Sequence, residues 1–493
     1  MGLKTSDAHL DGIRDGREVY LGGERIEDVT SHPAFAESAR SVASLYDITS
    51  DPANADRFTF EQEGDRHSLI FLQPTSVEDL AARRALHETW AAATYGLMGR
   101  SPDHVAGFIT GMACEPDVFD RHDQGFGANI VNYWRYIRDN DLYVVYAVVP
   151  PTGTRNADTV VREDRSASDK DMQPAALRVI AHDDAGVTVR GFKILATGAL
   201  FADEVLVGNL LPLRPGEESF AITFAMPMAT PGLKILSRKS FAQPASTDGL
   251  LGTRFDESDA VLFFDDVKVP WERVFAHDKL DTSIAIFYDT PGHSLGNAQA
   301  HMRLLAKWRL MLGLLKMVTE VNQIAKVPAV QERVAALAVR VAMVEALVRA
   351  QEVDARTWPS GHVSQNRQTL YATMSWTCEI YPEFAETFRD LLGSSPFQVP
   401  ARDDVFENQY TAELVSAFLE LPATDVLDRY RLIKVAWDLV GTEFAARHLQ
   451  YETLYAGPKH VTRGRAGHFF DWSVVKRVAQ DCLDSAAGDR ALA

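Results

Sequence analysis

The sequence predicts an α+β fold in which a helical N-terminal domain, a central β domain and a C-terminal helical bundle follow one another along the chain. Two observations support this. Apolar residues recur at helical spacing towards both ends, and short runs rich in β-branched and aromatic residues fill the middle. The 493 residues, 46% of them hydrophobic, suffice for two or three cores. We place the domains at residues 1–140, 141–280 and 281–493.

The N-terminal domain is predicted to be mostly helical. Apolar residues recur every three or four positions in the run VEDLAARRALHETWAAATYGLMG (77–99), and Gly, Pro and Asp separate such runs. The next segment, GRSPDH (99–104), looks like a helix start, because Pro102 and Asp103 suit a first turn. Arg100 is then either a solvent-facing residue beside a capped helix or a fixed positive charge that can hold an anion.

The central domain is predicted to be an antiparallel barrel or sandwich. Runs such as LYVVYAVV (142–149) and GFKILATG (191–198) have strand length and composition, and turn signals separate them. The run RFDESDAVLFFDDVKVPWERVF (254–275) reads as a polar turn followed by a buried strand, so we expect it to be structural.

The C-terminal domain is predicted to be a helical bundle. Helical periodicity returns at about residue 297 and continues through runs such as VQERVAALAVRVAMVEALVRAQEVDART (330–357) with little β signal between them.

Charge and composition exclude several classes of protein. The formal net charge of -18 argues against a nucleic-acid partner, and the chain shows neither a secretory signal nor an apolar run of the ~20 residues that span a bilayer. We therefore expect a cytoplasmic protein without a membrane partner. Cys114, Cys378 and Cys482 lack the spacing of metal ligands, so we expect buried reduced thiols and no metal site.

Two short motifs suggest other functions. GHSLG (292–296) fits the G-x-S-x-G nucleophile elbow and would make Ser294 the nucleophile of a serine hydrolase. That elbow needs alternating strands and helices, whereas helices follow here, so the alternative is that Ser294 and Asn297 begin a helix. GFGANI (125–130) lacks the third glycine and the preceding strand of a dinucleotide-binding motif, and we expect a loop there.

Several segments, in the same order, resemble the 4-hydroxyphenylacetate 3-monooxygenase family, the large components of two-component flavin monooxygenases. They are DGREVYLGGERIEDVTSHPAF (15–35), GRSPD (99–103), GFKILATGALFAD (191–203), RFDESDAVLFFDDVKVPWERVF (254–275) and VAWDLVGTEFAARHLQYETLYAG (435–457). The resemblance implies the acyl-CoA dehydrogenase fold, with a helical N-terminal domain, a β domain and a C-terminal four-helix bundle.

The resemblance also implies an activity. Reduced FAD (FADH2, in preference to FMNH2) would arrive by diffusion from a separate NAD(P)H:flavin reductase and react with O2 to give a C4a-hydroperoxide. This species would hydroxylate a small, phenol-like aromatic substrate in a site that excludes water. A homotetramer, built as a dimer of dimers, is implied as well.

Three residues are implied as catalytic: Arg100, His104 and Tyr146. Arg100 would lie beside the flavin ring and the substrate oxygen and stabilise negative charge. His104 stands where the 4-hydroxyphenylacetate enzymes have Tyr, and Tyr146 stands where they have a phenol-binding His. This exchange predicts a substrate other than 4-hydroxyphenylacetate.

The remaining implied site residues bind cofactor or substrate. Flavin contacts are expected from Pro150, Thr154, Arg155, Thr197 and Gly457. The loop 239–254 corresponds to a substrate lid, in which Ser246 and Thr247 would bind a polar tail of the substrate.

The same fold also serves a flavin and iron–sulfur dehydratase of 4-hydroxybutyryl-CoA and the acyl-CoA dehydrogenases, which are the alternative functions. The dehydratase needs cysteine ligands where this chain has Arg100 and His104. A dehydrogenase would hold its FAD tightly.

Overall fold

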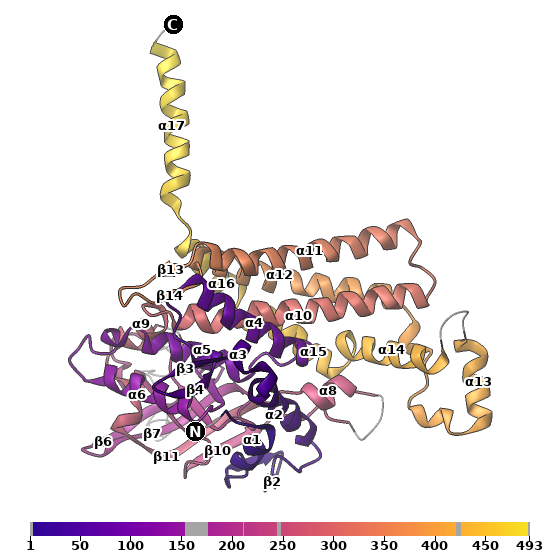
Figure 1. Ribbon diagram of the computed structural model, residues 1–493, viewed down its shortest axis with the longest axis horizontal. Coiled ribbons are helices and arrows are strands. Elements are labelled where there is room, and N and C mark those ends of the chain that lie inside the picture. The colour runs from indigo at the N-terminus through magenta and orange to yellow at the C-terminus, as the bar shows by residue number, and fades with distance from the viewer. Residues whose placement is uncertain (1–2, 153–175, 211, 244–247, 421–424, 492–493) are drawn as a thin grey trace, which may run out of the picture.

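A computed structural model describes residues 3–152, 176–210, 212–243, 248–420 and 425–491 of the chain (Figure 1). Helices come first, two β-sheets follow, and long helices complete the chain, so the predicted α+β class is confirmed. Within the described residues, no helix is long and apolar enough to cross a bilayer.

The N-terminal region is helical, as predicted, but it also contains strands. Its helices are α1 (Ser6–Gly12), α2 (Ala36–Ser50), α3 (Ala55–Phe58), α4 (Val77–Ala93), α5 (Pro102–Ala113) and α6 (Phe126–Asp139). A hairpin of β3 (Thr59–Gln62) and β4 (Asp65–Ser68) and the short strands β1 (Glu18–Leu21) and β2 (Glu24–Ile26) were not predicted. β1 pairs in parallel with a strand of the central region, a long-range contact that a four-residue pattern cannot reveal.

The central region contributes to two sheets whose buried side chains belong to one hydrophobic core. Its elements are β5 (Val144–Ala147), β6 (Arg178–Asp183), β7 (Gly186–Thr197), β8 (Glu204–Val207), β9 (Ile222–Pro227), β10 (Leu233–Ser237), α8 (Leu250–Phe255), β11 (Asp259–Pro270) and β12 (Val274–His277). One sheet has the order β2-β1-β10-β11-β7-β6 and the other β12-β9-β8-β5. The sheets are mixed rather than purely antiparallel, because β1 pairs with β10 and β5 with β8 in parallel.

The C-terminal region is a bundle of long helices. Its elements are α9 (Thr282–Tyr288), α10 (Gly292–Val321), α11 (Pro328–Val353), β13 (Arg356–Thr357), β14 (Val363–Ser364), α12 (Arg367–Leu392), α13 (Gln409–Leu419), α14 (Val426–Val440), α15 (Glu443–Leu454), α16 (Lys459–Phe469) and α17 (Trp472–Ala491). α10 packs against α11, α12 and α14, with Trp308 and Met311 fully buried.

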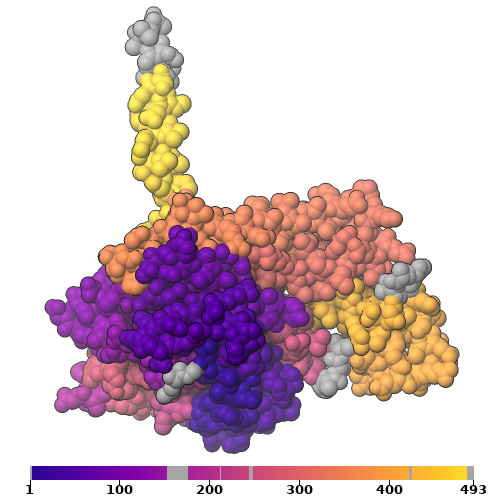
Figure 2. Space-filling model, in the orientation of Figure 1, coloured from indigo at the N-terminus to yellow at the C-terminus, as the bar shows by residue number. Residues whose placement is uncertain are grey.

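The last helix, α17, projects away from the rest of the chain (Figures 1 and 2). Cys482 lies on it and is exposed, so the expectation of a buried thiol is wrong there, because α17 extends beyond the other described elements (Figure 1). Cys114 and Cys378 are buried, as expected.

The GHSLG segment is the first turn of α10, where α10 crosses α5. A Cβ atom on Gly296 would lie 2.0 Å from the ring of Phe108, and one on Gly111 would lie 2.4 Å from the backbone nitrogen of Gly292. The glycines therefore let the two helices approach closely. Ser294 lies inside a helix that follows helix α9, not on the strand-to-helix turn that the hydrolase alternative requires.

Candidate active site

Arg100 lies in the loop between α4 and α5, and its peptide is held from both sides. The backbone N–H of Arg100 donates to Oε1 of Glu257 at 2.5 Å, and its carbonyl oxygen accepts from the hydroxyl of Tyr143 at 2.5 Å. The side chain is buried as well, with 7% of the residue exposed. The sequence-based reading of a solvent-facing arginine is therefore wrong.

The Arg100 guanidinium is surrounded by aromatic rings rather than by acids. Its Cζ lies 5.3 Å from the ring centres of Tyr146 and Tyr451 and 5.8 Å from that of Tyr455. Its Nη1 is buried without a hydrogen-bond partner, and no carboxylate forms an ion pair with it in the described part of the chain. Burial disfavours the charge, but nearby Tyr146, Tyr451 and Glu257 raise the pKa of Arg100 overall, so it stays a cation.

His104, in the first turn of α5, faces the same space. Its ring centre lies 5.5 Å from that of Tyr146 and 5.3 Å from that of Phe108. Burial first, and then the charges of Arg100 and Arg303, hold the pKa of His104 well below its ordinary value. The imidazole is therefore neutral near pH 7. The backbone of Gly296 and the side chain of Gln299 act on the ring as weak hydrogen-bond partners, although neither reaches normal hydrogen-bond geometry.

The structure thus brings Arg100, His104 and Tyr146 together. The buried polar atoms here that have no hydrogen-bond partner in the described residues are Nη1 of Arg100 and the hydroxyls of Tyr451 and Tyr455. Native proteins leave few buried polar atoms unsatisfied, so such a cluster indicates a bound group. A flat molecule with polar edges, such as the isoalloxazine of FAD or a phenol, fits these rings and donors.

One of the predicted flavin contacts, Thr197, lies near the same loop. Thr197 ends β7, and its hydroxyl donates to Oδ1 of Asp259 at 2.6 Å. A Cβ on the next residue, Gly198, would lie 2.3 Å from the Tyr143 hydroxyl that binds Arg100. Pro150 follows Val149, whose carbonyl accepts from the backbone N–H of Ile194 in β7 at 2.9 Å.

Gly457 lies in the turn after α15, with a φ of 102° that favours glycine, two residues beyond Tyr455. The other predicted contacts, Thr154, Arg155, Ser246 and Thr247, lie outside the described residues.

Acidic residues of the run 254–275, which the sequence analysis expected to be structural, connect the site to the helical bundle. Arg447 of α15 donates to Oε2 of Glu257 at 3.1 Å and to both carboxylate oxygens of Asp259 at 2.7 and 3.0 Å. Arg238 pairs with Asp256 and Asp259. Burial alone favours a neutral carboxyl, but Arg447 and Arg238 hold the pKa of Asp259 far below its ordinary value. No sequence signal identified these pairs, because their partners lie far apart in the chain.

A second buried ionic cluster lies between α10 and α15. Glu452 accepts from Nη1 and Nη2 of Arg303 at 2.5 and 2.8 Å and from Nζ of Lys307 at 2.9 Å. Burial favours the neutral acid, but the two cations lower the pKa of Glu452 to about 2. In this cluster each charge has a partner.

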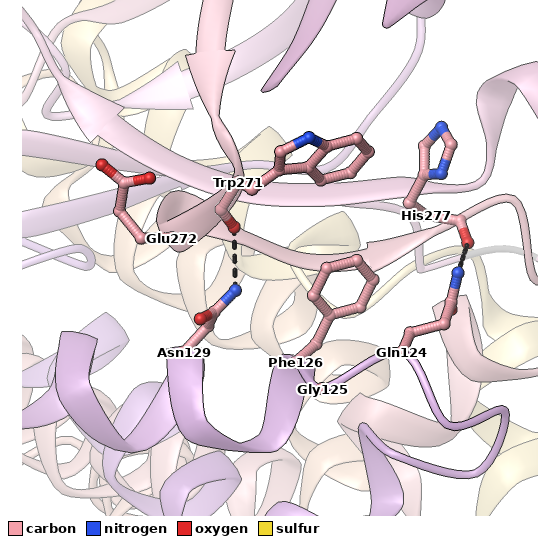
Figure 3. Close-up of a pocket in the computed structure, with 7 residues that line it drawn as sticks. All are labelled: Gln124, Gly125, Phe126, Asn129, Trp271, Glu272 and His277. Atoms are coloured by element: carbon pink, nitrogen blue, oxygen red, sulfur yellow. Dashed lines mark hydrogen bonds between the residues drawn. The ribbon is translucent and has the colours of Figure 1, made fainter. Parts of the chain in front are cut away.

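Figure 3 shows a separate, open cavity of about 460 Å³. It is lined by Gln124, Gly125, Phe126, Asn129, Trp271, Glu272 and His277. The rings of Phe126 and Trp271 stack at 6.3 Å, while the amides of Gln124 and Asn129 donate to backbone carbonyls. The GFGANI segment (125–130) begins helix α6 at Phe126, so the expectation of a loop there is wrong. None of the residues that surround Arg100 lines this cavity.

Two family models and several known proteins match this chain. Family models described as the 4-hydroxyphenylacetate 3-hydroxylase N terminal and C terminal match residues 5–276 and 284–484. The 4-hydroxyphenylacetate 3-monooxygenase oxygenase component of Geobacillus sp. (strain PA-9) is 30% identical, over 93% of this chain and 92% of its own length. The 4-nitrophenol 2-monooxygenase oxygenase component of a Rhodococcus species is also 30% identical, over 93% and 87%.

Solved structures extend the comparison to the fold. The oxygenase component (HpaB) of 4-hydroxyphenylacetate 3-monooxygenase, complexed with FAD and 4-hydroxyphenylacetate, has a TM-score of 0.90 and 28% identity over 98% of this chain and 99% of its own. A 4-hydroxybutyryl-CoA dehydratase from N. maritimus has a TM-score of 0.84 at 17% identity over 98% and 95%, and shares the fold alone.

Proposed function

The chain belongs to the 4-hydroxyphenylacetate 3-hydroxylase family, and from this we propose that it is the oxygenase component of a two-component flavin-dependent monooxygenase. It takes FADH2 from a separate reductase and hydroxylates a small aromatic substrate. The observation that carries this proposal is the buried Arg100 guanidinium, which has tyrosine rings and neutral His104 beside it and forms no ion pair with a carboxylate in the described residues.

Bound FADH2 supplies two electrons and activates O2, so that one oxygen atom enters the ring and the other leaves as water. Arg100 attracts the phenolic oxygen and stabilises its negative charge as the ring becomes nucleophilic. A ring nitrogen of neutral His104 accepts the phenolic proton, and the Tyr146 hydroxyl donates to the same oxygen. The rings of Tyr451 and Tyr455 exclude water from this space.

We propose that the substrate differs from 4-hydroxyphenylacetate. His104 and Tyr146 contact each other across the site, in exchanged positions relative to the pattern of the 4-hydroxyphenylacetate enzymes. An imidazole and a hydroxyl at exchanged positions bind a phenol in a different orientation. The test is kcat/KM for 4-hydroxyphenylacetate and a panel of other phenols. The double variant His104→Tyr/Tyr146→His should gain activity on 4-hydroxyphenylacetate; a wild-type preference for that substrate would contradict the proposal.

The function itself is tested with purified protein, chemically reduced FAD, a panel of phenols and ¹⁸O₂. The expected product is a catechol that carries a single labelled oxygen atom, formed without any reductase present, because reduced FAD arrives by diffusion. Oxidised FAD is the control and should give no product. If no phenol in the panel gains oxygen, the proposed function is wrong.

We further propose that the protein is a cytoplasmic homotetramer. Large apolar side chains on α17 support association, since Trp472 is 57%, Val478 65% and Leu483 64% exposed, and a second copy of the chain would cover them. Sedimentation of the full chain and of a variant that ends at residue 470 tests this. The full chain should sediment as a tetramer and the shorter one as a smaller species.

A further inference from the structure

We propose that Glu257 is a positioning residue for Arg100. Its carboxylate binds the backbone N–H of Arg100 and leaves the guanidinium free of an ion pair. The proposal rests on the proposed function, because Arg100 matters only if its guanidinium meets the substrate oxygen. It concerns a residue whose sequence context, an acidic turn before a strand, suggested only a structural role.

The two oxygens of the Glu257 carboxylate have separate partners. Oε1 accepts from the backbone N–H of Arg100, and Oε2 accepts from Nη1 of Arg447. Both oxygens are therefore engaged, and neither pairs with the Arg100 guanidinium. An acid bound to that guanidinium would compete with a phenolate for the same donors. The arrangement fixes the position of Arg100 and leaves its charge available.

Glu257 is itself held rigidly. It is 3% exposed, and its own carbonyl accepts from the backbone N–H of Gly198 at 3.1 Å. The next residue, Ser258, adopts a left-handed conformation with a φ of 53°, which costs energy for a non-glycine residue and persists only where its surroundings enforce it. The carboxylate is thus aimed by a turn that cannot relax easily.

Helix α15 contacts Arg100 by two routes. Arg447 reaches it through Glu257, and Tyr451, one turn later on the same helix, places its ring 5.3 Å from the guanidinium. The Cζ of Arg447 also lies 4.7 Å from the centre of the Tyr451 ring. A Cβ on Gly99 would lie 2.3 Å from the Tyr451 hydroxyl, so the loop and the helix are in close contact. Movement of α15 would therefore shift the loop and the ring together.

The test compares Glu257→Met with Glu257→Gln. Methionine keeps the length of the side chain but cannot accept the Arg100 N–H, whereas the glutamine amide oxygen can. With the preferred phenol, Glu257→Met should lower kcat about 100-fold, because a displacement near 1 Å has an effect of that order. Glu257→Gln should stay within about fivefold of wild type. The KM and the affinity for reduced FAD should change less than about threefold in both.

The matched control is the same pair of substitutions at Glu204. This glutamate is 2% exposed and its side chain pairs with Arg273 at 2.8 Å. In the described part of the chain, no hydrogen bond or ion pair joins that side chain to the loop of Arg100. Both Glu204 variants should lose thermal stability while kcat stays within about twofold of wild type. They separate loss of a buried ion pair from loss of the peptide contact.

Equal losses of kcat in Glu257→Gln and Glu257→Met, parallel to equal losses of Tm, would overturn the proposal, because Glu257 would then act only by pairing with Arg447. Should Glu257→Met fail to fold, Tyr143→Phe removes the other hydrogen bond that holds the Arg100 backbone. Unchanged kcat in that variant would also overturn the proposal, because it would show that the position of this backbone does not affect the reaction. Wild-type protein that oxygenates no phenol would instead count against the proposed function, so the two failures are distinguishable.

Discussion

Arg100 and Arg303 are both buried arginines, but the protein treats their charges in opposite ways. Arg303 makes a two-pronged ion pair with Glu452, which Lys307 joins, and 1% of the residue is exposed. Arg100, 7% exposed, has aromatic rings around its guanidinium, and no carboxylate pairs with that group among the described residues. Because an unpaired buried charge is costly, the first arrangement holds the fold together and the second indicates a place for an anion.

Loss of the ion pairs between Glu452 and its two cations should have the greatest consequence for stability. Glu452→Gln leaves Arg303 and Lys307 buried without a full counter-charge, so the free energy of unfolding should fall by about 3 to 5 kcal/mol. Chemical denaturation measures this. The fraction that remains folded should still hydroxylate its substrate. Unchanged stability would mean that water or another group already neutralises the cluster.

Removal of the unpaired charge of Arg100 should act on the reaction and not on stability. Arg100→Met should lower hydroxylation about 100- to 1000-fold, or roughly 3 to 4 kcal/mol of barrier, because the guanidinium no longer stabilises negative charge on the substrate oxygen. The free energy of unfolding should not fall, since no ion pair is lost. Steady-state kinetics and denaturation of the same sample check both halves. A large loss of stability would show that Arg100 is structural, like Arg303.

Lys193 shows a third way to bury a cation. Its Nζ donates to the carbonyl oxygen of Gly208 at 2.7 Å and to Oδ1 of Asn209 at 3.0 Å, and burial lowers the pKa of Lys193 to about 7. The unfolded lysine, with its ordinary pKa of 10.5, binds more protons than the folded one above pH 7. Charged Lys193 therefore destabilises the fold at low pH, and the unfolding free energy rises with pH.

From pH 7 to pH 9 this rise should contribute roughly 2 to 3 kcal/mol, because each pH unit is worth about 1.4 kcal/mol for a single proton. The comparison is with Lys193→Met, in which that contribution is absent. Denaturation of both proteins at several pH values gives the difference. Identical pH profiles would show that Lys193 keeps its ordinary pKa and that the structure tolerates its charge.

Substitution of Ser294 tests whether a buried polar atom without a partner always indicates function, and it should have little effect. The hydroxyl of Ser294 is buried without a hydrogen-bond partner in the described residues, yet it lies in the close crossing of α5 and α10. Ser294→Ala should change hydroxylation by less than about twofold and stability by less than about 1 kcal/mol. Loss of activity in this variant would extend the site to α10.

The sequence predicted the elements whose signals are local. The helical run predicted from residue 77 is α4, and the period of the central runs matches β7 and β11. The family resemblance predicted that Arg100, His104 and Tyr146 belong to one site. The contacts of Glu257 with Arg100 and Arg447 could not be predicted, because they join residues 157 and 190 positions apart.

We propose that the space beside Arg100 holds a reduced flavin. An equilibrium titration of the purified protein with FAD in both redox states, followed by flavin fluorescence or by anaerobic absorbance, tests this directly. Reduced FAD should bind saturably. Absence of association in either redox state would contradict it, and only the architecture would then stand.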